Sequence, residues 1–368
     1  MSFIVKEITI QEGIEDFLFI PSEIYRDDPN WIAPQNSELL RVLDPLKNPY
    51  FLNASLKIYV CFSDGKPVCR AVLVINHLYW RRWNKKAAFF GFFESINDNN
   101  AVRYLFEKME SDCRDEGAEY LEGPFNPNHY SELGILVDNF NSAPVFFDTY
   151  NPSYYPSLLK ETGFSESDLF HTRINTDILT TLSNKYRISH DTCLRGDITV
   201  RKFNILRLKR DLEILRNINN NAFESNRFFL SLSLKEYLFS AKYLFLVTSP
   251  ALILIAEYKG QPVGAVQLVL NLNSLLKHYN GKIKWWNIPS ILIKRRKLQE
   301  LIIFSAGIIK EFKNKRVFAL LMKSAIKIFR NYSSVSTTWI ADENLGINLG
   351  SLLEMRTGKH FAIYSKQL

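Results

Sequence analysis

DGKPVCRAVLVINHL at 64–78 and KGQPVGAVQLVLNLN at 259–273 are two versions of one sequence motif. Glycine, proline, valine and asparagine recur at matching places, and Gly65 and Gly260 are 195 positions apart, as are the other three pairs. Each version is typical of a hairpin turn followed by an apolar strand. Chance similarity of turns and strands is the alternative, but a constant separation over four residue types favours an internal repeat.

The repeat continues beyond the hairpin in both halves of the chain. Three further pairs of stretches match: 88–117 with 301–331, 119–126 with 337–344, and 157–164 with 351–359. Asn126 and Asn344 are 218 positions apart, so the second half has 23 extra residues (218 − 195), which we place in an insertion after its hairpin. The first half has an insertion of its own at 126–150.

These matches predict the fold class and the domain organisation. Each half is expected to be α/β, with a central twisted mixed sheet (an α+β arrangement) flanked by helices. We expect two tandem domains, at 1–182 and 198–368, joined by a polar linker at 183–197.

Length and composition limit the class of protein. A chain of 368 residues fits two domains. Its first residues include acids and lack the basic start of a signal peptide, and no stretch has the roughly 18 uninterrupted apolar residues of a membrane span. The four cysteines show no CxxC spacing, which favours reduced core residues of a cytoplasmic protein and no metal site: Cys61, Cys69, Cys113 and Cys193.

The stretch GIIKEFKNKRVFALL at 307–321 predicts a strand, a basic loop and the start of a helix. The N-terminus of a helix behind a basic loop suits a phosphate group. The glycines that usually let a backbone approach a phosphate are missing, so a plain basic turn before a core helix is the alternative. The matching loop of the first half, Glu94 to Asp98, is acidic and should repel phosphate.

The order of elements resembles that of the GNAT acyltransferase superfamily. The stretch 307–321 looks like the acyl-CoA loop of that superfamily, and ENLGINLGSLLEMRTG at 343–358 looks like its C-terminal element of Asn, helix and Gly. The chain is also similar to a tandem bacterial group, some of whose members are implicated in long-chain N-acylation, including ceramide synthesis. The stretches that carry this likeness are DDPNWIAPQ (27–35), LRVLDPLKNPYF (40–51), GFFES (91–95), EGPFNPN (122–128) and YNPSYYPSLLKETGF (150–164).

The resemblance implies a donor site for acyl-CoA or an acyl-phosphopantetheine. A backbone N–H at Ile308 or Ile309 would stabilise the oxyanion, and the helix that begins near Arg316 or Val317 would face the pyrophosphate. The other donor-site residues that the likeness assigns are Lys313, Asn314, Lys315 and Asn344. The superfamily often has a Tyr acid in its last helix, but the corresponding place, 352–355, has none.

The acceptor amine must lose a proton, so a carboxylate or a histidine is expected near the thioester. The candidates are Glu94 at the end of an apolar run, and His129 and Glu132 in the first insertion. Glu94 is equally consistent with an acid near the start of a helix, and His129 with a surface loop.

Residues 271–299 have seven lysines and arginines, no acid, and two adjacent tryptophans. Tryptophan favours a membrane interface and cations favour anionic headgroups, so 282–297 is a candidate contact with the inner membrane. An acidic acyl-carrier protein is a second partner for such a surface, and a hairpin that covers the core is the structural alternative. Nucleic acid is not the expected partner, because the apolar run at 288–293 suits lipid better than stacked bases.

We therefore expect an N-acyltransferase that transfers an acyl group from acyl-CoA or acyl-carrier protein to a primary amine, with a long-chain or lipid amine as the favoured acceptor. The alternative is a GNAT-fold protein that has lost catalysis and binds a lipid or a protein. A nucleic-acid-binding accessory protein is a further rival.

Overall fold

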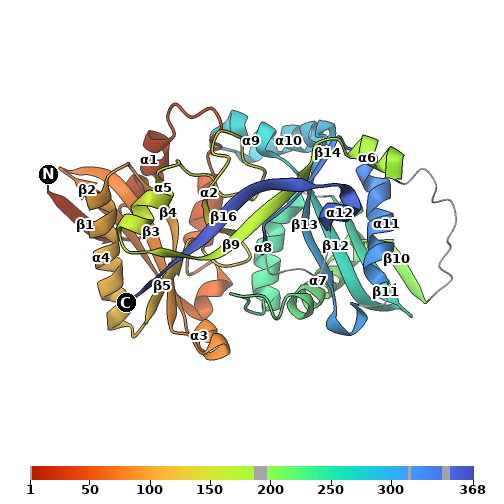
Figure 1. Cartoon of the computed structure of the whole chain (residues 1–368), viewed down its shortest axis with the longest axis horizontal. Coiled ribbons are helices and arrows are strands. Elements are labelled where there is room, and N and C mark those ends of the chain that lie inside the picture. The colour runs from red at the N-terminus through yellow and green to blue at the C-terminus, as the bar shows by residue number, and fades with distance from the viewer. Residues whose placement is uncertain (1, 186–196, 248, 314–315, 342–348) are drawn as a thin grey trace. The chain divides into compact units, whose positions relative to one another are not determined.

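The computed structural model describes residues 2–185, 197–247, 249–313, 316–341 and 349–368 (Figure 1). The chain forms two compact units. Unit 1 comprises 1–171, 276–285 and 359–368, and unit 2 comprises 172–275 and 286–358. Strands β9 and β16 therefore contribute residues to both units. The division at 183–197 expected from the sequence stays a prediction, and most of that segment lies outside the described residues.

The hairpin of unit 1 is followed by a strand, a helix and a further strand. The helices and strands of this unit are β1 (Phe3–Ile8), α1 (Ile14–Ile24), α2 (Asn36–Leu43), β2 (Ala54–Ser63), β3 (Lys66–Asn76), α3 (His77–Trp83), β4 (Ala87–Ser95), α4 (Asn99–Asp115), β5 (Tyr120–Gly123), β6 (Phe125–Asn126), β7 (Glu132–Leu133), β8 (Ile135–Leu136), α5 (Tyr155–Glu161), and most of β9 (Ser165–Asn175) and β16 (Arg356–Gln367).

Unit 2 repeats this order with different decorations. Its helices and strands are α6 (Ile178–Lys185), β10 (Ile198–Lys202), α7 (Leu208–Ala222), α8 (Leu234–Val247), β11 (Ile253–Tyr258), β12 (Gln261–Leu270), α9 (Asn273–Leu276, whose last residue clusters with unit 1), α10 (Ile288–Lys294), β13 (Glu300–Ile308), α11 (Val317–Phe329), β14 (Ser334–Thr337), β15 (Ile340–Ala341) and α12 (Leu349–Leu353).

The two hairpins of the repeat have the same backbone. Asp64 and Gly65 have φ values of 47° and 80°, and Lys259 and Gly260 have 48° and 80°. Two successive left-handed residues make the turn that matches the twist of paired strands, and glycine fits the second position without strain. The hairpins β2–β3 and β11–β12 and the two sheets confirm the predicted α/β fold with its repeated halves.

Each unit has a mixed sheet. In unit 1 the order is β1-β2-β3-β4-β5-β16, and in unit 2 it is β14-β13-β12-β11-β10, with the last residues of β9 beside β14. Strands β4 and β5 are parallel, and so are β13 and β14. The other pairs within these orders for which a register is described are antiparallel. Each parallel pair is joined by a crossover helix, α4 in unit 1 and α11 in unit 2.

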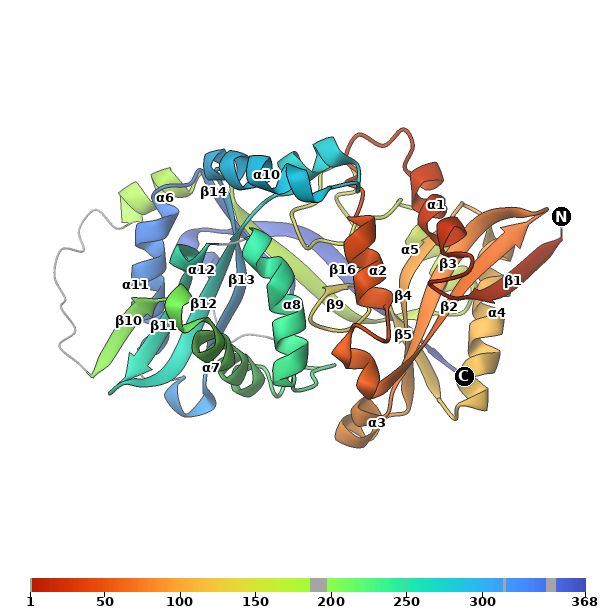
Figure 2. The same cartoon turned by 180° about the vertical axis from the view of Figure 1, so that it is seen from behind.

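Helices cover both faces of the unit 2 sheet (Figure 2). A Cβ added to Gly307 would lie 3.1 Å from Ala222 of α7, and one added to Gly264 would lie 3.0 Å from Val317 of α11. Gly264 is paired with Ile308, which follows Gly307, so the two glycines point to opposite faces. Helix α7 therefore lies on one face and α11 on the other, and both approach too closely for a larger residue.

The core of unit 1 lies between its sheet and helices α4 and α5. Phe90 and Phe106 are almost fully buried, and their rings meet edge to face at 5.2 Å. Cys61, Cys69 and Cys113 are buried and unbonded, in agreement with their prediction as core residues, and Cys193 lies outside the described residues.

The strand register divides the 23 extra residues of the second half. Ile96 N–H donates to the Val68 carbonyl and Ile309 N–H donates to the Val263 carbonyl, at 3.0 Å in both. The two donors are 213 positions apart, whereas the two acceptors are 195 positions apart. The difference, 18 of the extra residues, lies between the hairpin and the start of β13. The other five lie between β13 and α11, because their helix starts, Asn99 and Val317, are 218 apart. The single insertion expected from the sequence is therefore two, the second of which lengthens the basic loop.

No helix among the described residues is long and apolar enough to cross a bilayer.

Candidate functional site

Strand β13 extends beyond the end of its parallel neighbour β14. Their register runs from Glu300 opposite Ser334 to Ile303 opposite Thr337, whereas β13 continues for five more residues to Ile308. The bulge in the β12–β13 register falls at Phe304, directly after the last parallel pair. No β13–β14 pair beyond Ile303 is described, although Thr338 Oγ1 still donates to the Phe304 carbonyl at 3.2 Å. We call the edge of β13 from Ser305 to Ile308 the diverging edge.

The N–H of Ile308 points toward that diverging edge. In an antiparallel pair, successive N–H groups alternate between the two sides of a strand. The Ile309 N–H is bonded to Val263 of β12, so the preceding N–H, that of Ile308, faces away from β12. Of the two residues that the resemblance proposes for an oxyanion contact, the geometry therefore favours Ile308, because the Ile309 N–H is already used in the sheet.

Helix α11 begins at Val317, and seven residues (310–316) separate it from Ile309. Its capping residue, Arg316, is left-handed at φ 57° and makes no side-chain cap, and its side chain is exposed. Leu320 N–H bonds the Arg316 carbonyl, so the amides of the first turn point out of the helix. The charge of the exposed Arg316 side chain therefore lies beside the positive end of the helix dipole.

Lys313 is exposed in the same loop, and Lys310 is held in place. The Lys310 N–H donates to Asn221 Oδ1 at 2.8 Å, and its Nζ donates to Glu224 Oε2 at 2.6 Å. Helix α7 thus fixes the start of the loop. Val317 is buried against Gly264 and anchors the first turn of α11. Asn314 and Lys315 lie outside the described residues, as does Asn344.

Polar side chains line the α7–α8 face of the sheet beside the diverging edge. Ser305 Oγ donates to Asn219 Oδ1 at 3.2 Å, and Tyr237 OH donates to Gln267 Oε1 at 3.4 Å. Ser305 and Gln267 are paired across β13 and β12, so they share a face. Gln267 is 4% exposed, and its Nε2 has no hydrogen-bond partner among the described residues. This cluster was not predicted, because nothing in the sequence shows that Asn219, Tyr237 and Gln267 converge.

The corresponding edge of β4 in unit 1 is closed by the chain itself. Ser95 lies 213 positions before Ile308, and its N–H donates to Tyr155 OH at 2.8 Å. The Ser95 carbonyl accepts from Tyr154 OH at 2.8 Å, and the Phe92 N–H donates to Asn126 Oδ1 at 2.7 Å. Side chains of this unit therefore occupy backbone groups that a pantetheine would need.

The N-terminus of the crossover helix of unit 1, α4, is capped by a side chain. Asp98 Oδ1 accepts from Asn100 N–H at 2.8 Å and from Ala101 N–H at 3.3 Å, which caps the N-terminus of α4. A carboxylate thus stands where unit 2 has an uncapped helix behind a basic loop.

Glu94 lies in a buried hydrogen-bond cluster of unit 1. Its Oε2 accepts from Tyr155 OH at 2.7 Å and from Tyr25 OH at 2.9 Å, and its Oε1 is 3.8 Å from the Arg70 guanidinium. The side chain is 15% exposed, and burial raises its pKa while Arg70 and the two tyrosines oppose that rise. Burial raises the pKa of both tyrosines as well, so they stay neutral donors.

The other two acceptor-side candidates lie near this cluster in unit 1. Glu132 is exposed, and its Oε2 accepts from Asn126 Nδ2 at 3.4 Å. The ring of His129 lies 3.9 Å from that of Tyr130, and burial lowers its pKa to about 3, so it is neutral at pH 7. The structure thus links Glu132 to β4 through Asn126. Desolvation and the charge of Glu94 raise the pKa of Glu132, against the effect of Asn126.

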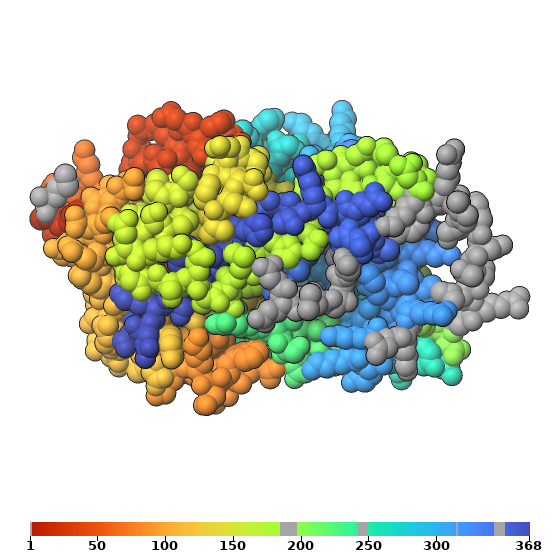
Figure 3. Space-filling model, in the orientation of Figure 1, coloured from red at the N-terminus to blue at the C-terminus, as the bar shows by residue number. Residues whose placement is uncertain are grey.

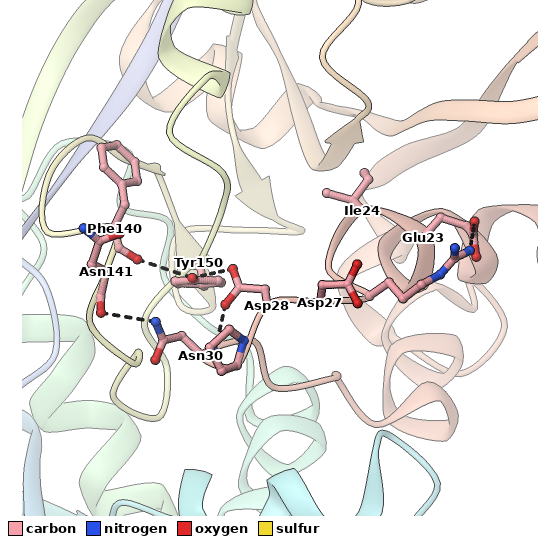
Figure 4. Close-up of a pocket in the computed structure, with 10 residues that line it drawn as sticks. Glu23, Ile24, Asp27, Asp28, Asn30, Phe140, Asn141 and Tyr150 are labelled. Atoms are coloured by element: carbon pink, nitrogen blue, oxygen red, sulfur yellow. Dashed lines mark hydrogen bonds and ion pairs between the residues drawn. The ribbon is translucent and has the colours of Figure 1, made fainter.

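The first-half insertion packs against the segment that follows α1 in unit 1. Tyr150 OH donates to Asp28 Oδ2 at 2.7 Å, and Asn30 Nδ2 donates to the Asn141 carbonyl at 3.2 Å (Figure 4). These residues line an open cavity of about 480 Å³ with Glu23 and Asp27. Figure 3 shows the insertion, in yellow, at the surface beside the red helix segment. The polar groups of this cavity are largely bonded to one another, so we assign it no role.

Asp148 in the first-half insertion is a titratable group that was not predicted as a site residue from the sequence. Burial raises its pKa to about 7, against the opposing effects of the Val145 N–H, which it accepts at 3.1 Å, and of the Lys359 charge. Lys359 Nζ donates to the carbonyls of Asn139 and Ser142 and so fastens the insertion to β16. These contacts give Asp148 and Lys359 a structural role, so we assign them no catalytic one. The described residues contain no cluster of three or more His, Cys, Asp and Glu that suits a metal ion.

Comparisons with known proteins agree on the architecture. No family model matches the chain. It is 26% identical to Protein YghO of Escherichia coli K12, over 99% of this chain and 95% of that one. It is 24% identical to the bacterial ceramide synthase of Caulobacter vibrioides, over 95% and 93%.

Among solved structures, it is similar to a tandem GNAT protein from the clavulanic acid biosynthesis pathway, with a TM-score of 0.58 and 9% identity over 100% and 98% of the two chains. It is also similar to a probable N-acyltransferase of Enterococcus faecalis V583, with a TM-score of 0.55 and 9% identity over 100% and 73%. The chain therefore has the tandem GNAT fold, as the sequence resemblance predicted.

Proposed function

We propose that this tandem GNAT-fold protein is an N-acyltransferase. It takes an acyl group from a phosphopantetheine thioester and transfers it to a primary amine, with one donor site per chain, in unit 2. The observation that carries the proposal is the diverging edge of β13, which ends at Ile308 and leads through a basic loop to the uncapped N-terminus of α11.

The donor would lie along this edge. The backbone groups of β13 beyond Phe304 would pair with the amide-containing pantetheine arm, as an added strand pairs with a sheet edge. The first-turn amides of α11 would face the phosphate, with Lys313 and Arg316 adding positive charge. A loop without glycines fits this arrangement, because Arg316 adopts the left-handed backbone itself and points its side chain outward.

The chemistry needs few side chains. The amine nitrogen attacks the thioester carbon, and the carbonyl oxygen becomes an oxyanion that the Ile308 N–H is placed to stabilise. The C–S bond then breaks, the thiolate leaves and takes a proton, and the nitrogen loses one to give the amide. Ser305, Gln267 and Tyr237 are neutral, and burial raises the pKa of Tyr237, so we assign them to orienting the acceptor.

A long-chain or lipid amine is the acceptor that we propose. The support is the likeness, along nearly the whole of both chains, to a protein named bacterial ceramide synthase. A ceramide is the N-acyl derivative of a long-chain amino alcohol. Either coenzyme A or an acyl-carrier protein can present the same thioester, and both are to be tested as donors.

The test is isothermal titration of the full chain with acyl-CoAs of 2, 8 and 16 carbons and with acyl-carrier protein. Thiol release is then followed with a long-chain amine. We expect one donor per chain and amine-dependent release. No binding of any donor would overturn the proposal.

The rival is a GNAT-fold protein without catalysis. It predicts donor or lipid binding with no amine-dependent thiol release, whatever the donor. The closed edge in unit 1 is consistent with a blocked site of that kind, and the diverging edge in unit 2 is what favours the enzyme.

A further inference from the structure

The helical segment 285–297, which belongs to unit 2 except for Trp285, presents apolar side chains to solvent. It consists of a short 3₁₀ turn (Trp285–Asn287), α10 (Ile288–Lys294) and a second 3₁₀ turn (Arg295–Lys297). Trp286 is 55% exposed and Ile293 64%. These two residues are seven positions apart and so lie on one helix face, whereas Ile291, at 8% exposure, lies on the face turned to the protein.

Cations surround this apolar face. Lys294, Arg296 and Lys297 are exposed, and none of the three forms an ion pair within the part of the chain that the structure describes. No acid occurs between 271 and 299. Burial and the positive charge of Arg296 also lower the pKa of Arg295, which shows that like charges crowd here. An anionic partner would relieve this repulsion.

We propose that this α10 face, defined by Trp286, Ile293, Lys294, Arg296 and Lys297, docks the protein on an anionic lipid bilayer. A tryptophan and an isoleucine suit the boundary between headgroups and acyl chains, and the flanking cations suit anionic headgroups. The segment is too short to span, so it would lie in the interface. Nucleic acid would use the cations but would leave the isoleucine exposed.

The position of the α10 face in unit 2 is consistent with the donor site. The segment leads directly into the start of β13, and Ile308 lies at the other end of that strand (Figure 2). Nine residues of strand place the two ends about 25 Å apart. A docked protein would therefore hold the phosphates of a donor away from the anionic surface. The docking itself does not depend on the proposed function.

The experiment is flotation of the full chain with vesicles of phosphatidylcholine alone and of phosphatidylcholine mixed with phosphatidylglycerol. We expect binding to the mixed vesicles only. K294E/R296E/K297E should weaken it by about tenfold or more, because each cation near the surface contributes. Trp286→Ser alone should weaken it by a smaller factor, and this single variant keeps the test decisive if the triple variant unfolds.

A matched control is available in the same unit. Ile205, Leu206, Arg207, Lys209 and Arg210 form another exposed segment of apolar and basic residues. R207E/K209E/R210E changes the net charge by the same amount near the start of α7, where acids are favourable. We expect it to leave flotation unchanged. The proposal is overturned if the wild-type chain does not float, if the control loses binding as much as the α10 variant, or if a labelled oligonucleotide binds more tightly than the vesicles.

Discussion

Strands β4 and β13 occupy the same place in the two units and differ in what meets their ends. In β4 the Ser95 N–H is bonded to Tyr155, whereas its counterpart in β13, Ile308, faces a diverging edge. Glu94 fills the position that Gly307 has in unit 2, where α7 leaves no room for a side chain. One sheet therefore serves as a closed structural unit and the other as a candidate catalytic unit, although both keep the same register.

The difference teaches that a GNAT-like edge is opened or closed by a few hydrogen bonds. Closing takes a phenol at 155, an amide at 126 and a carboxylate at 98, each of which satisfies a backbone group. An edge without such partners has to find them in water or in a ligand.

Ile308→Pro should have the largest effect on activity. Proline removes the N–H, and an edge position that donates nothing to β12 tolerates it. Loss of one oxyanion donor typically costs about 100-fold to 1000-fold in kcat. Steady-state thiol release measures this, and the matched change Ser95→Pro in unit 1 should lower the melting temperature and leave the kcat of the folded fraction unchanged. If Ile308→Pro stays folded and fully active, Ile308 is not the oxyanion contact.

Arg316→Asp should convert the helix start of unit 2 into that of unit 1. The new carboxylate would lie beside the positive end of the α11 dipole, and it would repel a phosphate. We expect the Kd of the donor to rise about tenfold or more while the melting temperature holds or rises, because an acid favours this end of a helix. Titration calorimetry and a thermal melt report the two effects. Lys327→Glu changes the charge equally at the far end of α11 and should leave the Kd unchanged; an equal loss there would mean that net charge alone sets affinity.

Tyr155→Phe should break the closure of β4. It leaves the fully buried Ser95 N–H without an acceptor and takes one donor from Glu94, which together should cost about 2–3 kcal/mol of unfolding free energy. Urea unfolding measures the change. Tyr104→Phe, at an exposed tyrosine of the same unit, is the control and should cost nothing measurable. A stability loss no larger than that of the control would show that the closure is not maintained in solution.

The sequence predicts the fold and the repeat well because both depend on local patterns. Gly65 and Gly260 mark the same turn, and Val68 and Val263 accept the same hydrogen bond, so a constant separation is enough to recognise them. The strand, the basic loop and the helix start at 307–321 were also recognisable from their local pattern. The sequence does not show that Arg316 is the left-handed residue, because arginine has no preference for that backbone.

The polar cluster beside β13 was harder to predict for a physical reason. Asn219, Tyr237, Gln267 and Ser305 come from two helices and two strands, and only packing brings them together. Glu94 was singled out as a candidate base because it ends an apolar strand. Its two phenol partners, Tyr25 and Tyr155, lie 69 and 61 positions away in the chain, too far for any local pattern to reveal.

Glu94→Gln tests whether this acid is catalytic or structural, and the expected effect is the smallest of the four. Burial raises the pKa of Glu94 in the folded chain above its ordinary value of 4.5, so the folded state binds the proton more tightly than the unfolded state. The contribution of Glu94 to stability is therefore fully present below pH 4.5 and is lost as the pH rises through the folded pKa. The variant should lose this part of the pH dependence, which urea unfolding between pH 4 and pH 8 would show as a flatter profile. If Glu94 instead accepts the proton of the amine, Glu94→Gln would remove turnover at pH 7 with donor binding intact, which would contradict a purely structural role.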